Sequence, residues 1–304
     1  MLTVSVPGDE ARAFLGDLPA EVRLVGWDGL GPRPDGAESV EMFVGRYNAA
    51  PPSAEVLADL PQLRVIQLLS AGVEPWLRVV PDGVMLCNGR GVHGASTAEL
   101  AVAGLLAVVR EIPAFLAAQA EHRWERLVAD GLDGRHVLVL GAGDIGTRVG
   151  AAVRAFGAEV TLVARRARDG IRAIDDLPAL LPDHGAVVIA LPLTPQTNRM
   201  VDKRFLAALP DGAVLVNVAR GAIVDTDALL AELTDRRLRA FLDVTDPEPL
   251  PADHPLWDAP NLLLTPHVGG GTHGWERRAY ELVRAQMLRL LRGEPLVNQV
   301  TAGY

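Results

Sequence analysis

The sequence predicts an α/β fold built on doubly wound parallel sheets. Short runs of apolar, often β-branched residues alternate with helical patterns along almost the whole chain. Most of these runs are continuously apolar, which is typical of strands that are buried on both faces of a parallel sheet. A glycine-rich turn joins one such run to a helical pattern near the middle of the chain. Together these observations favour consecutive β-α-β units with right-handed crossovers.

The predicted strands form two groups, which are separated by a long helical segment that follows residue 94. Strands are expected at residues 22–27, 40–44, 63–69 and 84–88, and again at 136–140, 160–164, 186–191, 213–218, 240–244 and 262–265. Helices are expected at 9–17, 53–60, 96–109, 145–156 and 275–292. Ser96 or Thr97 is the predicted N-cap of the helix over 96–109, which is apolar on nearly all sides and should therefore be buried.

The 304 residues are enough for two domains. Because apolar strands already precede the late glycine turn, we predict a discontinuous substrate domain, residues 1–93 plus 271–304. The coenzyme domain is predicted to span residues 94–270.

Composition excludes several classes of function. The net charge is −9, and no basic block is present that would indicate binding to nucleic acid or to an anionic membrane. The apolar run over 100–109 is shorter than the roughly 20 residues that cross a bilayer. Cys87 is the one cysteine, so no intrachain disulfide can form, and a cytoplasmic location is expected. No group of His, Cys and Asp has metal-ligand spacing, so no metal is expected.

The glycine-rich turn reads Gly141-Ala142-Gly143-Asp144-Ile145-Gly146 and is the strongest local motif. It follows a predicted strand and opens a predicted helix, which is the context that a dinucleotide-binding fingerprint requires. Gly141 permits the tight turn, Gly143 lets the backbone approach a pyrophosphate at the helix N-terminus, and Gly146 allows close packing of helix and strand. The alternative is a glycine turn that binds nothing.

The end of the following strand indicates which nicotinamide cofactor is bound. NAD-binding folds usually place an acidic residue there to bind the ribose 2′-hydroxyl, but this chain reads Ala164-Arg165-Arg166. An acid would repel a 2′-phosphate, whereas arginine pairs with it through charge-assisted hydrogen bonds. The sequence therefore predicts NADP(H) in preference to NAD(H), with Arg168 able to share the role. The alternative is that these arginines are solvated surface residues.

Three later segments each place a titratable or charged residue shortly after an apolar strand: Arg220, Glu248 and His267. In open α/β sheets, ligands bind outside the carboxyl ends of the strands, so these three side chains are expected to converge.

With these segments the chain resembles the D-isomer-specific 2-hydroxyacid dehydrogenases. The resemblance covers nearly the whole sequence and is carried by 70–73, 96–99, the glycine turn, 191–194, 215–225, 242–251 and 265–270. It implies a Rossmann-type doubly wound coenzyme domain and a smaller flavodoxin-like α/β substrate domain. The stretch over 247–257 is most similar to that of glyoxylate and hydroxypyruvate reductases.

The resemblance also implies roles for individual residues in moving a hydride between NADP(H) and a small 2-keto or 2-hydroxy acid. His267 matches the family's acid/base, and Glu248 matches the carboxylate that orients it. A histidine suits the acid/base role because its ordinary pKa lies near working pH. Arg220 matches the group that binds the substrate carboxylate. Further matches are the substrate-binding backbone of Ala71, Gly72 and Val73, and the cofactor contacts Thr97, Pro192 and Asp243.

Two alternatives remain open on the sequence. One is a relative that keeps the fold but oxidises another small donor, such as formate or phosphite. The other is a non-catalytic nicotinamide-sensing protein, although the chain ends at Tyr304, soon after the last helix, and no extended partner-binding tail is expected. A homodimer is predicted, because 96–109 and 112–124 offer more apolar surface than one domain is expected to bury.

Overall fold

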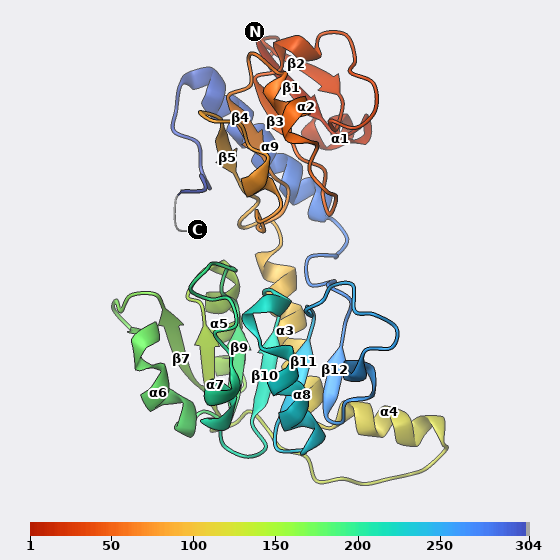
Figure 1. Cartoon of the computed structure of the whole chain (residues 1–304), viewed down its shortest axis with the longest axis vertical. Helices are drawn as coiled ribbons and strands as arrows, with labels where there is room; N and C mark the ends of the chain where they lie inside the picture. Colours follow the sequence, from red (N-terminus) through yellow and green to blue (C-terminus); the bar gives the residue numbers. More distant parts are fainter. Residues whose placement is uncertain (302–304) are drawn as a thin grey trace. The chain divides into compact units, whose positions relative to one another are not determined.

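The computed structural model describes residues 1–301. The chain forms two compact units, Met1–His93 with Gly271–Tyr304, and Gly94–Gly270 (Figure 1). Each unit contains its own parallel β-sheet. The predicted α/β fold class is therefore confirmed.

The first unit is built on a five-stranded sheet in the order β2-β1-β3-β4-β5. This is the flavodoxin-like order, in which the first crossover runs one way and the later ones the other. The strands are β1 (Leu2–Val6), β2 (Val22–Gly26), β3 (Met42–Val44), β4 (Val65–Gln67) and β5 (Met85–Cys87). Because all pairs are parallel, the segments after β3, β4 and β5 leave the sheet at the same edge.

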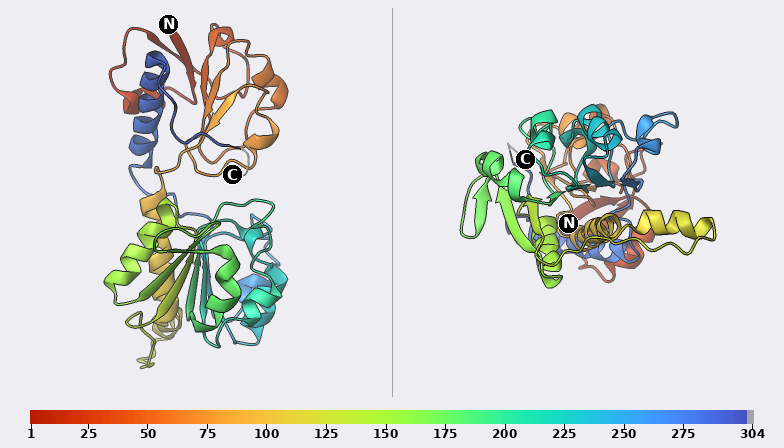
Figure 2. Two further views of the ribbon diagram at one scale, coloured as in Figure 1. Left: turned by 90° about the vertical axis from the view of Figure 1, so that its left-hand side faces the viewer. Right: turned by 90° about the horizontal axis from the view of Figure 1, so that it is seen from below.

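Helices cover both faces of this sheet (Figure 2). On one face, α1 (Glu10–Leu15) and α9 (Trp275–Arg292) share a buried cluster with β1. On the other face lie α2 (Ala54–Ala58) and the 3-10 segments η1 (Ala37–Ser39) and η2 (Trp76–Arg78). Residues from the end of the chain thus complete a core that residues 1–93 begin.

The second unit is built on a seven-stranded parallel sheet in the order β12-β11-β10-β9-β6-β7-β8. Its strands are β6 (His136–Leu140), β7 (Glu159–Ala164), β8 (Ile171–Ala173), β9 (Ala186–Ile189), β10 (Val214–Asn217), β11 (Arg239–Leu242) and β12 (Leu262–Leu264). The strand order reverses between β6 and β9, and such a switch point is where doubly wound sheets bind dinucleotides.

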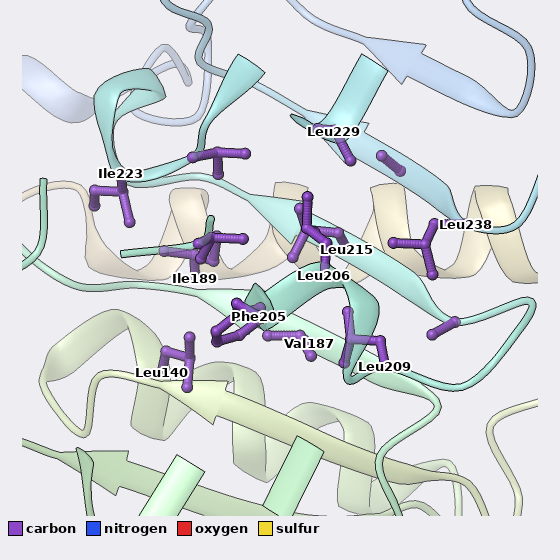
Figure 3. Packing of buried hydrophobic residues seen from close by; sticks show 14 of the residues in the cluster. Leu140, Val187, Ile189, Phe205, Leu206, Leu209, Leu215, Ile223, Leu229 and Leu238 are labelled. Carbon is purple, nitrogen blue, oxygen red and sulfur yellow. The ribbon is translucent and has the colours of Figure 1, made fainter. Parts of the chain in front are cut away.

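The two faces of the second sheet carry separate apolar clusters. α3 (Gly94–Val109) and α5 (Asp144–Ala155) pack on one face. The other face is covered by α6 (Leu177–Leu180), α7 (Lys203–Ala207) and α8 (Thr226–Thr234), with η3 (Ile174–Asp176), η4 (Leu181–Asp183), η5 (Gly221–Ile223) and η6 (Pro255–Asp258) in the connections. Figure 3 shows Phe205 and Leu206 of α7 lying among Leu140, Val187 and Leu215 of the sheet.

The predicted N-cap of α3 is wrong. The helix begins at Gly94, so Ser96 and Thr97 lie inside its first turn and are buried. A Cβ atom at Gly94 would overlap the carboxylate of Asp144, so the first residue of the helix lies in a close tertiary contact that local sequence does not signal.

The helix that follows, α4 (Ile112–Ala120), is bent by 67° from α3. Among residues 1–301, none of the helices is by itself long and apolar enough to cross a membrane, although α3 and α4 taken together meet that test by length and composition.

Candidate active site

The glycine turn lies tightly against the switch point of the second sheet. Gly141 has a φ of 111°, and a side chain there would overlap the carbonyl group of Ala190, just after β9. A Cβ at Gly146 would overlap the carbonyl oxygen of Gly141. Two of the three glycines are therefore required by the packing of strand, turn and helix.

Gly143 differs, because a Cβ there would meet no atom of the chain within 4 Å. It is the N-cap of α5, whose first N–H groups have no partner inside the helix. Asp144 follows, and its carboxylate pairs with Arg148 at 2.8 Å, which offsets a negative charge beside an anion site. Open space above a helix N-terminus fits the pyrophosphate of a dinucleotide. Ile145 lies half-buried in the same first turn.

Arginines gather where β7 ends. Arg165 and Arg166 directly follow this strand and are exposed. Arg168 turns back, and its Nη2 donates to the carbonyl oxygen of Ala142 in the glycine turn at 3.1 Å. The guanidinium of Arg168 is therefore held beside the turn. These positions fit a dinucleotide that carries an additional phosphate, since guanidinium groups bind phosphate through paired hydrogen bonds.

Two further predicted cofactor contacts lie in the same unit. Pro192 follows β9, and its carbonyl oxygen accepts a hydrogen bond from Thr197 Oγ1 at 2.7 Å. Thr97 is buried in the first turn of α3, and its Cγ2 would lie 3.3 Å from a Cβ added at Gly269. The start of α3 thus has two neighbours. Gly94 lies against Asp144, and Thr97 lies against the loop that carries His267.

Arg220 is held by a turn that directly follows β10. Buried Asn217 organises this turn, because its Nδ2 donates to Arg220 O at 2.9 Å and its Oδ1 accepts from Ala219 N at 3.0 Å. A Cβ at Gly221 would overlap the backbone of Thr245. The turn therefore lies directly against the segment that follows β11 and leads to Glu248.

Glu248 and His267 form a direct pair. Glu248 Oε1 lies 2.6 Å from His267 Nδ1, and both side chains are a little more than one-third exposed (39% and 38%). The hydrogen bond from His267 holds the pKa of Glu248 below its ordinary value, although partial burial acts the other way, and Arg220 contributes electrostatically. The carboxylate is therefore ionised at neutral pH and accepts from Nδ1. The structure thus brings these three predicted residues together.

Asp243 holds the loop that carries His267. Its buried carboxylate accepts from Thr265 Oγ1 at 2.6 Å, from Val268 N at 2.9 Å and from Gly269 N at 2.9 Å. Its backbone carbonyl accepts from His267 N at 2.7 Å. His267 has a φ of 53°, in the left-handed region that costs a non-glycine residue energy, and these bonds stabilise it there.

Sequence reasoning did not identify Asn217 or Thr265, and it assigned Asp243 to the cofactor alone. Their position in the sequence was the available signal, because each of the three residues ends or directly follows an apolar strand that leads to a predicted functional residue. The predicted substrate loop, Ala71 to Val73, belongs to the first unit, where it follows β4.

Comparisons with known proteins agree with this geometry. Residues 102–269 match the family model described as "D-isomer specific 2-hydroxyacid dehydrogenase, NAD binding domain". The D-3-phosphoglycerate dehydrogenase of Mycobacterium tuberculosis is 36% identical over 82% of this chain, but the match covers only 49% of that enzyme. The chain thus spans about half the length of these relatives.

Shorter relatives match over most of their length. Glyoxylate/hydroxypyruvate reductase A of Escherichia fergusonii is 33% identical over 86% of this chain and 83% of its own. The crystal structure of a D-isomer specific 2-hydroxyacid dehydrogenase from Xanthobacter autotrophicus Py2, in complex with NADPH and MES, superimposes with a TM-score of 0.85 at 30% identity. That match covers 99% of this chain and 98% of the other. The chain belongs to the D-isomer specific 2-hydroxyacid dehydrogenase family.

Proposed function

We propose that the protein reduces a small 2-keto acid, of the glyoxylate or hydroxypyruvate type, with NADPH as the preferred reductant. The observation that carries the proposal is the Glu248–His267 hydrogen bond of 2.6 Å beside Arg220. When bound, the cofactor supplies the hydride that adds to the keto carbon. The remaining chemistry is proton transfer and charge stabilisation by the protein.

His267 is the proton donor in this proposal. The negative charge that develops on the keto oxygen must be neutralised by a proton, and a histidine titrates near working pH. Because Glu248 accepts from Nδ1, it fixes the ring orientation and stabilises the imidazolium, which leaves Nε2 to donate to the substrate oxygen. In the reverse direction the same nitrogen accepts the proton of the hydroxyl group.

Arg220 binds and polarises the substrate. Its guanidinium is placed by a hydrogen bond from Nη1 to Ala219 O at 2.7 Å, the Asn217 turn fixes the backbone from which it projects, and its other N–H groups bind a carboxylate. The backbone amides of Ala71 and Gly72 bind the carboxylate as well, whereas the third predicted contact, Val73, is fully buried. Hydrogen bonds that hold the substrate carboxylate restrict the orientation of the keto carbon, which lowers the entropic part of the barrier.

The proposal is tested directly with a panel of 2-keto acids, each assayed by loss of NADPH or NADH absorbance. Turnover of glyoxylate or hydroxypyruvate, with a higher kcat/KM for NADPH than for NADH, is the expected result. If NADPH binds but no 2-keto acid is reduced, the protein is a sensor or acts on another donor, and the proposal is wrong.

The cofactor preference makes a separate prediction. Replacing Arg165 and Arg166 together with alanine should raise the KM for NADPH about tenfold, because charge-assisted hydrogen bonds to the 2′-phosphate are lost. The KM for NADH should stay nearly unchanged, since NADH lacks that phosphate. The difference should shrink at high salt, because the interaction is between exposed charges. Ala164→Asp should shift the preference further toward NADH through repulsion of the phosphate.

The matched control removes the same charge elsewhere. Lys203 and Arg204 are exposed neighbours at the start of α7, and their double alanine variant should leave both cofactor KM values at the parent level. Parent-like NADPH kinetics in the Arg165/Arg166 variant, or a parent enzyme that prefers NADH, would contradict the assignment.

We also infer that the protein is a homodimer. α4 extends away from the seven-stranded sheet (Figure 1). This helix and the segment after it carry exposed apolar side chains. Leu116 is 59% exposed, Trp124 91% and Val128 104%. Light scattering at micromolar concentration should give twice the mass of the chain, because such a surface is stabilised by burial against a second copy.

Leu116→Glu should shift the mass toward that of one chain. Phe156 is a suitable control, since it is 50% exposed in the same unit but lies at the end of α5, and Phe156→Glu should leave the mass unchanged. A single-chain mass for the parent would rule out the dimer.

A further inference from the structure

The loop that follows β4 is held from one side by residues that follow β5. Three consecutive carbonyl oxygens of this loop each have a partner there. Leu69 O lies 3.0 Å from His93 Nε2, Ser70 O accepts from Gly89 N at 2.6 Å, and Ala71 O accepts from Asn88 Nδ2 at 3.0 Å. All of these residues belong to the first unit.

These bonds determine where the amides of the loop point. In a trans peptide the carbonyl of one residue and the N–H of the next lie in one plane and point in opposite directions. Gly89, by holding Ser70 O, therefore sets the direction of the Ala71 N–H. Asn88, by holding Ala71 O, sets the direction of the Gly72 N–H.

The third amide is oriented within the loop itself. Ser70 Oγ donates to Gly72 O at 3.3 Å, which fixes the peptide that carries the Val73 N–H. Within residues 1–301, neither the Gly72 N–H nor the Val73 N–H donates a hydrogen bond to the chain. Gly72 is partly exposed, so its N–H is available to an acceptor from outside the chain, whereas Val73 is 0% exposed.

Asn88 is itself rigidly placed. It is 6% exposed, its backbone N donates to Asn298 O at 3.0 Å, and its Oδ1 accepts from Arg90 N at 3.1 Å. A backbone N–H can only donate and a carbonyl oxygen can only accept, so the oxygen of the side chain must face Arg90 and its nitrogen must face Ala71. Gly89 allows this close approach, because a Cβ there would lie 2.6 Å from the carbonyl carbon of Leu69.

Residues 298–300, near the end of the chain, fix the backbone of Asn88 through hydrogen bonds to the end of β5 and the residue that follows it. Val300 N donates to Leu86 O at 2.8 Å, so residues 298–300 run alongside β5. Buried Gln286 of α9 accepts from Val297 N at 3.1 Å and donates to Gln67 Oε1 at 2.9 Å. The helix, this segment and the end of β4 are thus joined through one buried polar network.

We propose that Asn88 is a positioning residue for substrate binding: through Ala71 O it aims the Gly72 N–H at the carboxylate of the 2-keto acid. The inference rests on the proposed function. It adds a residue that does not touch the substrate but determines the affinity of the loop for it. Because the carboxylate is bound in the ground state and in the transition state alike, loss of the contact affects KM and leaves kcat nearly unchanged.

Asn88→Asp is the sharpest variant. It keeps the shape of the side chain and the oxygen that accepts from Arg90, but it replaces the donor to Ala71 O with a second acceptor, which repels the carbonyl. The KM for glyoxylate should rise about tenfold or more, as for loss of a hydrogen bond to a charged group. kcat and the KM for NADPH should each stay within about threefold of the parent.

Asn298→Asp is the matched control. Asn298 Nδ2 donates to Arg90 O at 2.9 Å, so the same chemical change is made a short distance away, without altering the bond to Ala71. The KM for glyoxylate should stay within about twofold of the parent. If thermal unfolding shows that the Asn88→Asp variant is not folded, Asn88→Ala serves in its place. It removes the same donor without a buried charge and should raise the KM in the same way.

The outcomes separate the two proposals. A parent protein that reduces no 2-keto acid overturns the proposed function, and this inference with it. An active parent whose Asn88 variants keep the parental KM, or lose kcat at constant KM, overturns the inference alone. An equal rise in KM for Asn88→Asp and Asn298→Asp shows a general effect of the segment and also overturns it.

Discussion

His267→Ala is expected to lower kcat for 2-keto acid reduction by about 10²–10⁴-fold, the usual effect of removing a positioned general acid. NADPH affinity should remain near the parent value, because the imidazole acts on the substrate oxygen. Stopped-flow or steady-state turnover, combined with a fluorescence titration of NADPH, separates the two effects. Glu248→Gln should give a smaller loss, since the amide oxygen still accepts from Nδ1 but no longer carries a charge.

The chain offers a close control for this variant. His136 pairs with Glu159 at 3.2 Å at the opposite edge of the same sheet, where strands β6 and β7 begin. His136→Ala removes a histidine from a comparable pair and should leave kcat unaltered. If His267→Ala retained kcat within a few-fold of the parent, another group would have to be the proton donor.

Gly146→Ala is expected to have the second largest effect. The added Cβ would overlap the carbonyl oxygen of Gly141, which is backbone and cannot move without opening the turn. Overpacking of this kind costs about 1–3 kcal/mol or more, and the thermal unfolding midpoint should fall by several degrees. NADPH binding should be lost together with stability, because Gly143, the N-cap of α5, lies in the same turn.

Gly150→Ala provides the comparison on the same helix. The nearest atoms to its added Cβ belong to the side chains of Leu162 and Val160, at 3.3 and 3.4 Å, and these can adjust. Alanine also favours the helix over glycine by about 1 kcal/mol. This variant should therefore be as stable as the parent or more so, with unchanged NADPH binding. Equal stability of the two variants would contradict this prediction, because it would mean that the turn at Gly141 accommodates the added Cβ without a cost in stability.

The fold class could be predicted because most of the strands are continuous apolar runs. β1 (Leu2–Val6) was not predicted, although it is an interior strand and fully buried. Thr3 and Ser5 interrupt its apolar pattern, and Ser5 is tolerated inside because its hydroxyl donates to Trp27 O at 2.5 Å. That partner lies 22 residues away, so the local pattern could not show it.

The sequence identified individual residues of the candidate site but not the contacts between them. Arg220, Glu248 and His267 were identified because charged groups follow apolar strands in the order that the family shows. Their contact could not be derived, because it depends on the register of β10, β11 and β12. The support that Asp243 gives to the loop of His267 uses mainly backbone N–H groups as donors, which leave no pattern in side-chain identity.

The division of the chain has a consequence for its synthesis. Residues 1–93 leave the ribosome without α9, yet Ala279, Tyr280, Val283 and Met287 of that helix are buried against the sheet that these residues form. One face of the N-terminal sheet therefore stays only partly covered, by α1, while residues 94–270, a unit with its own core, are made and fold. The usual order, in which the N-terminal domain folds first, is thus reversed: the part made first is the part completed last.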